Sequence, residues 1–201
     1  MRKLHPMAGA ALALAAAVAA LPAHASTLAD TGAPGASPVG GLALDGNDWV
    51  AGEISVGSAT TLGAIQGYIS GDTRGETFTV ALYGQGAAGV PGALLDSATA
   101  TFGGDGWNGL SAAGWKVGPG SYWVAFEVGQ NDTLASAFEL STMNVGAPSP
   151  LANVAYFDGS GYHPWSASFG LRVLAVPEPD PAWLYAAGLG LLAFSMRRRR
   201  G

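Results

Sequence analysis

The sequence contains no cysteine among its 201 residues. Disulfide bonds, thiolate metal ligands, iron–sulfur clusters and cysteine nucleophiles are therefore excluded. A domain of about 150 residues buries roughly two-thirds of the surface of its unfolded chain, which is sufficient for a core without disulfides. We therefore expect a domain that is held together by packing alone.

Basic residues are scarce outside the two ends of the chain. Six of the nine lysines and arginines lie at the ends, as Arg2, Lys3 and Arg197–Arg200. Between Ser26 and Val176, three basic residues stand against twelve acidic ones, a net charge of about −9. Because such a surface repels phosphate backbones and anionic head groups, nucleic acid is not expected as a partner.

Histidine is also rare, and His163 is the only one between Ser26 and Val176. This count excludes a histidine-rich metal site. A serine hydrolase would have to use His163, but the sequence has no G-x-S-x-G motif. We interpret His163 as a surface-loop residue without a catalytic role.

Acidic and amide residues gather in two segments, Asp45–Asp48 and Gly103–Gly109. Their oxygens suit calcium, but neither segment has the D-x-[DN]-x-[DN]-G spacing of a calcium loop. Asp, Asn and Gly are also the residues that turns require. We interpret both segments as turns and expect no metal or cofactor.

The N-terminus has the pattern of a secretory signal peptide. Two basic residues precede an apolar run from Met7 to Leu21, and Ala23 and Ala25 then form an A-x-A site. We expect residues 1–25 to be the signal peptide, with cleavage between Ala25 and Ser26. The alternative, an uncleaved membrane anchor, requires a longer apolar run.

The C-terminus has the pattern of a membrane-spanning segment. Residues 182–196 carry no charge, and a helix of that length covers about 22 Å of the roughly 30 Å of bilayer hydrocarbon. The long side chains of Arg197, Arg198, Arg199 and Arg200 extend the reach of the helix, and cationic flanks stay in the cytoplasm. We expect a transmembrane helix at 182–196, the arginine cluster 197–200 as its stop, and the rest of the protein outside.

Just before this helix, Val176, Pro177, Glu178 and Pro179 form the motif VPEP, and the prolines keep it extended. The order of this motif, one apolar helix and a terminal arginine cluster resembles the PEP-CTERM sorting signal of Gram-negative bacteria, over residues 176–201. The resemblance implies processing by the membrane enzyme exosortase. It places the protein in the inner membrane with a periplasmic ectodomain during sorting, and later at the cell surface or in an extracellular matrix with exopolysaccharide. An ordinary single-span anchor remains the alternative.

Alternation of apolar and polar residues dominates the middle of the chain, and glycine-rich turns interrupt it. Eight or nine such strands predict an all-β fold, a single antiparallel β-sandwich of jelly-roll type over residues 40–175. Residues 26–39 are small and polar, so we expect a flexible lead-in there. Two stretches, VALYGQGAAGVPGALLDS and VGPGSYWVAFEV, resemble a sandwich ectodomain that recurs in proteins with this tail. The predicted strands are Asp48–Val56, Thr61–Ile69, Thr77–Tyr83, Ala93–Phe102, Ser121–Val128, Leu134–Leu140, Asn153–Phe157 and Ser166–Leu174.

Aromatic residues in or beside loops are candidates for sugar contact, because sugars bind to exposed aromatic faces next to polar groups. The candidates are Trp107, Trp115, Tyr162 and Trp165. Their alternative role is to fill the core. We expect a non-catalytic surface or matrix protein. The alternative is a secreted carbohydrate-active enzyme or a glycan-binding module, but twelve acidic residues do not single out a catalytic pair.

Overall fold

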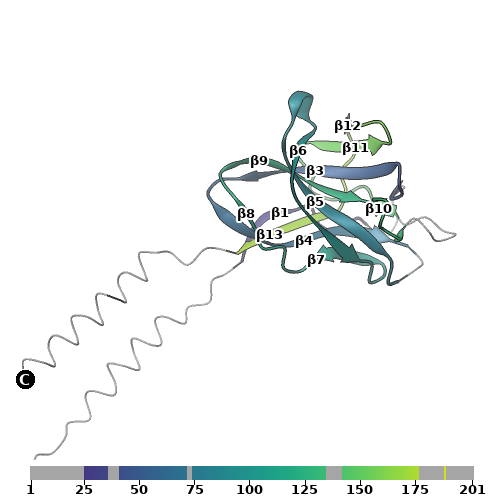
Figure 1. Cartoon of the computed structure of the whole chain (residues 1–201), viewed down its shortest axis with the longest axis horizontal. Helices are drawn as coiled ribbons and strands as arrows, with labels where there is room; N and C mark the ends of the chain where they lie inside the picture. The colour runs from purple at the N-terminus through teal and green to yellow at the C-terminus, as the bar shows by residue number, and fades with distance from the viewer. Residues whose placement is uncertain (1–24, 36–40, 72–73, 135–141, 177–187, 189–201) are drawn as a thin grey trace, which may run out of the picture. The chain divides into compact units, whose positions relative to one another are not determined.

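Strands make up almost all of the regular secondary structure (Figure 1). The computed structural model describes residues 25–35, 41–71, 74–134, 142–176 and 188. Within these ranges the strands are β1 (Ser26–Asp30), β2 (Gly41–Ala43), β3 (Asp48–Val56), β4 (Thr60–Ser70), β5 (Thr77–Gln85), β6 (Pro91–Thr101), β7 (Gly106–Leu110), β8 (Trp115–Val117), β9 (Gly120–Glu127), β10 (Thr142–Asn144), β11 (Val154–Asp158), β12 (Tyr162–Trp165) and β13 (Leu171–Val176). A short 3-10 helix, η1 (Ala87–Gly89), lies between β5 and β6.

The strands form two antiparallel sheets, which confirms the all-β prediction and is consistent with a β-sandwich. The seven-stranded sheet has the order β1-β13-β4-β10-β2, and β7 and β8 also pair with β4. Because β7 and β8 pair with residues of β4 that also pair with β13, they lie along the opposite edge of β4. The six-stranded sheet has the order β12-β11-β3-β9-β5-β6.

Alternate residues of both sheets enclose one hydrophobic core, as the periodicity of the sequence predicts. Phe78, Val80 and Leu82 of β5 are completely buried. The two sheets meet through aromatic rings: the ring centroid of Phe126 on β9 lies 6.2 Å from that of Phe169, two residues before the start of β13. Ala25–Val176 form one compact unit around this core.

Glycine on the inner faces allows the sheets to approach closely. A Cβ atom at Gly67 of β4 would lie 2.7 Å from Met143 Cε and 2.9 Å from the ring of Phe126. A Cβ atom at Gly52 of β3 would lie 2.7 Å from Leu151 and 3.1 Å from Leu171. Both positions therefore require the smallest residue, because side chains of the opposite sheet and of neighbouring segments occupy the space.

Several strand predictions need correction. The described residues contain thirteen strands instead of the expected eight or nine. β3 has the predicted bounds, but the strand predicted at Ser166–Leu174 is observed at Leu171–Val176, and Phe169 before it forms only an isolated bridge with Val145. Residues 135–141 of the strand predicted at Leu134–Leu140 lie outside the described residues. Gly106–Leu110, which we interpreted as part of a turn, forms β7 along β4.

The segment predicted as a flexible lead-in, residues 26–39, is in part a strand. Ser26–Asp30 form β1, which pairs with β13 at the edge of the seven-stranded sheet. Thr31 is 3 % exposed, and its hydroxyl bonds to the carbonyl of Phe169 and accepts the N–H of Leu171. The prediction failed because a small polar segment can gain a fixed conformation from pairing with a distant strand.

The predicted signal peptide up to residue 24 and the predicted membrane helix at 182–196 lie outside the described residues, apart from residue 188. Pro177, Glu178 and Pro179 of the sorting motif also lie outside the described residues. No helix within the described ranges is long and apolar enough to cross a membrane.

Replacing Gly67 with alanine tests the close approach of the sheets. We expect Gly67→Ala to lower the free energy of unfolding by about 1–3 kcal/mol, because Phe126 and Met143 must shift to admit a methyl group. Gly57→Ala is the matched control, because a Cβ atom there has nothing within 4 Å. It should change stability by less than about 0.5 kcal/mol. Urea denaturation of the purified chain measures both, and equal midpoints for the two variants would contradict the close packing.

Candidate functional site

The candidate site is the outer face of the six-stranded sheet, the side that points away from the core. Four alanines, Ala155, Ala51, Ala125 and Ala81, pair directly with one another across β11, β3, β9 and β5. We call this line of residues the alanine row. All four alanines are completely buried although they lie outside the core, because Tyr83, Val90 and Tyr162 pack over them. The outer face therefore carries a second, smaller hydrophobic cluster.

Larger residues lie on both sides of the alanine row. On one side, Phe157 pairs with Trp49 and Glu127 pairs with Thr79. On the other side, Trp123 pairs with Glu53 and with Tyr83. The small side chains of the alanine row therefore lie between two lines of larger side chains.

The side chain of Tyr83 crosses the alanine row to reach Glu127. Tyr83 belongs to one side of the alanine row and Glu127 to the other, yet the phenol oxygen donates to Glu127 Oε1 at 2.6 Å. The ring must therefore lie over Ala81 and Ala125, against which it packs. Larger side chains at positions 81 and 125 would occupy the space of the Tyr83 ring. The alanines therefore permit the hydrogen bond between Tyr83 and Glu127.

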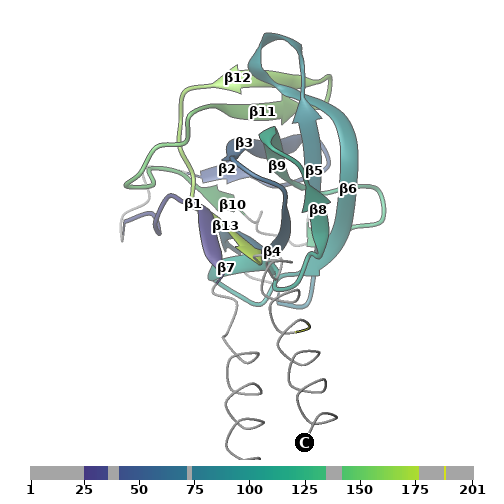
Figure 2. The same ribbon diagram turned by 90° about the vertical axis from the view of Figure 1, so that its left-hand side faces the viewer.

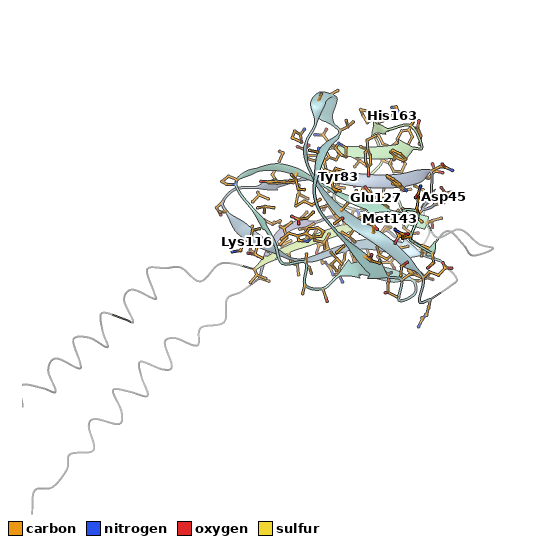
Figure 3. The ribbon with its side chains drawn as sticks, in the orientation of Figure 1. Asp45, Tyr83, Lys116, Glu127, Met143 and His163 are labelled. Atoms are coloured by element: carbon orange, nitrogen blue, oxygen red, sulfur yellow. The ribbon has the colours of Figure 1, made fainter. Side chains whose placement is uncertain are left out.

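A second tyrosine reaches the same oxygen from the far side of the sheet. The Tyr162 hydroxyl donates to Glu127 Oε1 at 2.7 Å. Tyr162 is on β12, and β11 and β3 separate β12 from β9. The hairpin β11–β12 must therefore curl over the outer face, and Figure 2 shows these two strands above β3 and β9. Figure 3 shows Glu127 beside Tyr83, with His163 further out on β12.

Glu127 is a buried carboxylate, 9 % exposed. Burial raises the pKa of Glu127 and outweighs the two tyrosine hydrogen bonds, which lower it. Burial also raises the pKa of Tyr83 and Tyr162, so both hydroxyls remain protonated donors at neutral pH. The Oε2 oxygen of Glu127 makes no hydrogen bond with the residues that the structure describes.

Four half-buried rings form a continuous aromatic strip on this face: Trp49, Phe157, Tyr162 and Tyr83. Trp49 stacks on Phe157 with centroids 4.1 Å apart. The ring centroid of Tyr162 lies 5.5 Å from that of Phe157 and 5.8 Å from that of Tyr83. Such a strip presents flat apolar surface next to a carboxylate, a combination that suits sugar rings.

Trp123 and Gln85 add a polar group beside the aromatic strip. The Trp123 ring is completely buried, and its indole N–H donates to Gln85 Oε1 at 2.9 Å. Gln85 itself is exposed. This bond holds the Gln85 carbonyl oxygen, and the NH₂ group of the same amide is a donor.

The structure separates the four aromatic residues that the sequence nominated. Tyr162 lies on the outer face of the six-stranded sheet, whereas Trp107 lies on the outer side of the seven-stranded sheet, where Arg172 stands 4.3 Å from its ring centroid. Trp115 is 9 % exposed and belongs to the core, and Trp165 packs against the core. These four residues do not form one surface.

The polar loops have structural roles. Asp45 Oδ1 accepts the N–H groups of Asn47 and Asp48, as expected for a turn. Asn108 shapes the other loop, because its side chain bonds to Gly103, Gly104 and Gly106. Among the described residues, no group of three or more His, Cys, Asp or Glu side chains is placed to hold a metal ion.

His163 lies on β12 with about half of its side chain exposed, and its Nε2 is 3.2 Å from Asp158 Oδ2. Hydrogen bonds from the side chain and backbone of Ser160 lower the pKa of Asp158 to about 2, so this carboxylate is ionised at neutral pH. The described surroundings of His163 contain no serine within hydrogen-bonding distance.

Glu127, Tyr83 and Trp49 were not among the candidate residues predicted from the sequence. A signal was nevertheless present in Ser121–Val128, where alternation places Tyr122, Val124 and Phe126 in the core. The remaining positions, including Trp123 and Glu127, must then point away from the core, and a large aromatic residue there is unusual for a solvated face.

Replacing Glu127 with glutamine tests the buried carboxylate. Because the folded pKa of Glu127 is raised, its contribution to stability is fully present below the unfolded pKa and is lost as pH rises through the folded pKa. Glutamine still accepts from both tyrosines but does not titrate. We therefore expect Glu127→Gln to gain stability relative to the natural chain as pH rises from about 4 to 7. Urea denaturation at several pH values measures this difference, and a difference that does not change with pH would contradict the raised pKa.

Comparison with known proteins does not indicate a function for the outer face. No protein-family model matches the chain, and no curated protein matches it either. What the outer face binds must therefore be inferred from its own residues.

Proposed function

We propose that the protein is an exported surface or matrix protein whose β-sandwich, of jelly-roll type, binds exopolysaccharide without catalysing a reaction. Its C-terminal residues 176–201, in this proposal, form a PEP-CTERM signal with one membrane helix that exosortase processes. The observation that carries the binding function is the aromatic strip, which converges on Glu127 over the outer face of the six-stranded sheet.

The ends of the folded unit support the export and sorting part of the proposal. Ser26, the expected first residue after signal cleavage, is the first residue of β1 and pairs with Ala175 of β13. Val176, the first residue of the VPEP motif, is the last residue of β13 and pairs with Thr61. A chain that starts at Ser26 and is processed beyond Val176 would therefore retain every pair of both strands.

The geometry of Glu127 favours binding over catalysis. Both tyrosines donate to Oε1, so the carboxylate is held in place beneath two phenol rings. The alternative is a carbohydrate-active enzyme on the same sandwich. The raised pKa of Glu127 favours that alternative, because a general acid in glycoside hydrolysis must be protonated at neutral pH.

Substitution of the stacked aromatic pair tests the binding face. We expect Trp49→Leu and Phe157→Leu each to weaken binding of the host's exopolysaccharide about tenfold, because leucine retains apolar volume but removes the flat ring. Tyr68→Leu is the matched control, since Tyr68 contacts Trp107 on the other sheet. Calorimetry measures affinity, and circular dichroism verifies folding.

Two results would contradict this proposal. Equal affinity of all three variants would place the binding site elsewhere. Release of shorter glycans by the natural chain, abolished in Glu127→Gln, would favour the enzyme instead.

Replacement of Pro177, Glu178 and Pro179 by Ala-Gln-Ala tests the sorting signal. In a host with exosortase, we expect the natural chain to be recovered as a mature protein that begins at Ser26 and lacks Arg197–Arg200. The variant should accumulate unprocessed in the inner membrane, because the prolines no longer keep the peptide extended and the charge of Glu178 is lost. Membrane fractionation and intact-mass measurement check both. An ordinary anchor predicts that both chains end at the same residue, have masses that differ only by the three substitutions, and distribute identically. That result would refute the sorting signal.

A further inference from the structure

We propose that the polysaccharide bound by the outer face carries free amino groups, which are ammonium ions when protonated. This inference rests on the proposed glycan-binding function and narrows its ligand class. It is carried by the distribution of charge between the two sheets, together with the aromatic strip.

The strands of the six-stranded sheet carry acidic residues and no lysine or arginine. Asp48 and Glu53 lie on β3, Asp96 on β6, Glu127 on β9 and Asp158 on β11. The β5 and β12 strands have no charged residue apart from His163. By register, Glu53 and Glu127 share the face of the alanine row, whereas Asp48, Asp96 and Asp158 lie in the register of core-facing residues. A ligand on the outer face therefore meets Glu53 and Glu127 without a basic residue of these strands beside them.

The three described basic residues lie elsewhere. Lys116 is on β8 and Arg172 is on β13, both in the seven-stranded sheet. Arg172 is also engaged, because its Nε lies 3.1 Å from Asp30 Oδ2. Arg74 lies before β5, with its guanidinium against Gly104. None of the described basic residues therefore belongs to a strand of the six-stranded sheet.

Three carboxylates border the outer face directly. Glu127 lies under the tyrosines, and Glu53 pairs with Trp123 in register and bonds to Asn153. Asp132, in the loop after β9, accepts from the Thr79 hydroxyl at 2.8 Å and raises the pKa of Glu127 through its charge. These groups combine hydrogen-bond acceptors with negative potential beside aromatic faces.

An amino-polysaccharide fits this combination better than a neutral or acidic one. Ammonium groups are attracted to aromatic faces and form charge-assisted hydrogen bonds with carboxylates. A uronic-acid or sulfated polysaccharide would be repelled, since none of the described basic residues lies on these strands. A neutral polysaccharide would use the rings but not the charges.

Three oligosaccharides of equal length test the ligand class: glucosamine hexamer, N-acetylglucosamine hexamer and an oligomer of uronic acid. We expect the purified full chain, at a pH where the amino groups are protonated, to bind the glucosamine hexamer at least tenfold more tightly than the acetylated hexamer. The uronic-acid oligomer should bind most weakly. Added salt should reduce the preference for glucosamine, because it screens exposed charges.

Acid-to-amide variants assign the preference to the outer face. The double variant Glu53→Gln/Glu127→Gln should lose most of the preference for glucosamine hexamer, measured as the ratio of its affinities for the amino and acetylated hexamers. Asp105→Asn is the matched control, because Asp105 accepts the N–H of Gly71 beside the other sheet, and it should keep the full preference. Equal binding of the amino and acetylated hexamers, or a preference unchanged in the double variant, would overturn this inference and leave glycan binding standing. Failure to bind any of the three hexamers, or the exopolysaccharide, would overturn both this inference and the proposed glycan-binding function.

Discussion

The arrangement of the outer face depends on one buried oxygen, Glu127 Oε1, which accepts hydrogen bonds from two tyrosines. These bonds join the neighbouring strands β5 and β9 to β12, which β11 and β3 separate from them in the sheet. Burial of a carboxylate is costly, and charge-assisted hydrogen bonds of about 1.5–3 kcal/mol each offset only part of that cost. The curl of the β11–β12 hairpin, the completely buried alanine row and the continuity of the aromatic strip all follow from this contact.

The two outer faces of the sandwich differ in how their charges are compensated. On the seven-stranded sheet, Arg172 pairs with Asp30 and lies over the ring of Trp107, so its charge is satisfied within the protein. On the six-stranded sheet, the strands carry acidic residues without a basic one. Aromatic residues occur on both faces, but only on the second do they stand beside uncompensated negative charge, and this difference separates a structural surface from a candidate binding surface.

Local pattern predicted the strands that alternate strictly and missed those that do not. β3 was predicted with its bounds, and the buried positions of β5 and β9 follow from the period of two. β1, β2, β7, β8, β10 and β12 were missed. β1 and β7 lie in a small polar segment and a glycine-rich loop, which carry little periodic signal, although β1 pairs with β13 and β7 with β4. Among the candidate contact residues, Tyr162 belongs to the outer face, whereas Trp115 belongs to the core. An aromatic residue beside a loop has the same local sequence pattern whether it lies on an outer face or in the core.

The sequence by itself determined the absence of thiol chemistry, the excess of acidic residues, the all-β character and which residues of each strand share a face. These properties depend on composition and on neighbours along the chain, so they can be read locally. Only the tertiary structure decided that Tyr83 and Tyr162 meet at Glu127, because these contacts join residues 44 and 35 positions apart. Strand order and register control such contacts, and they arise from the packing of the whole sandwich rather than from any one segment.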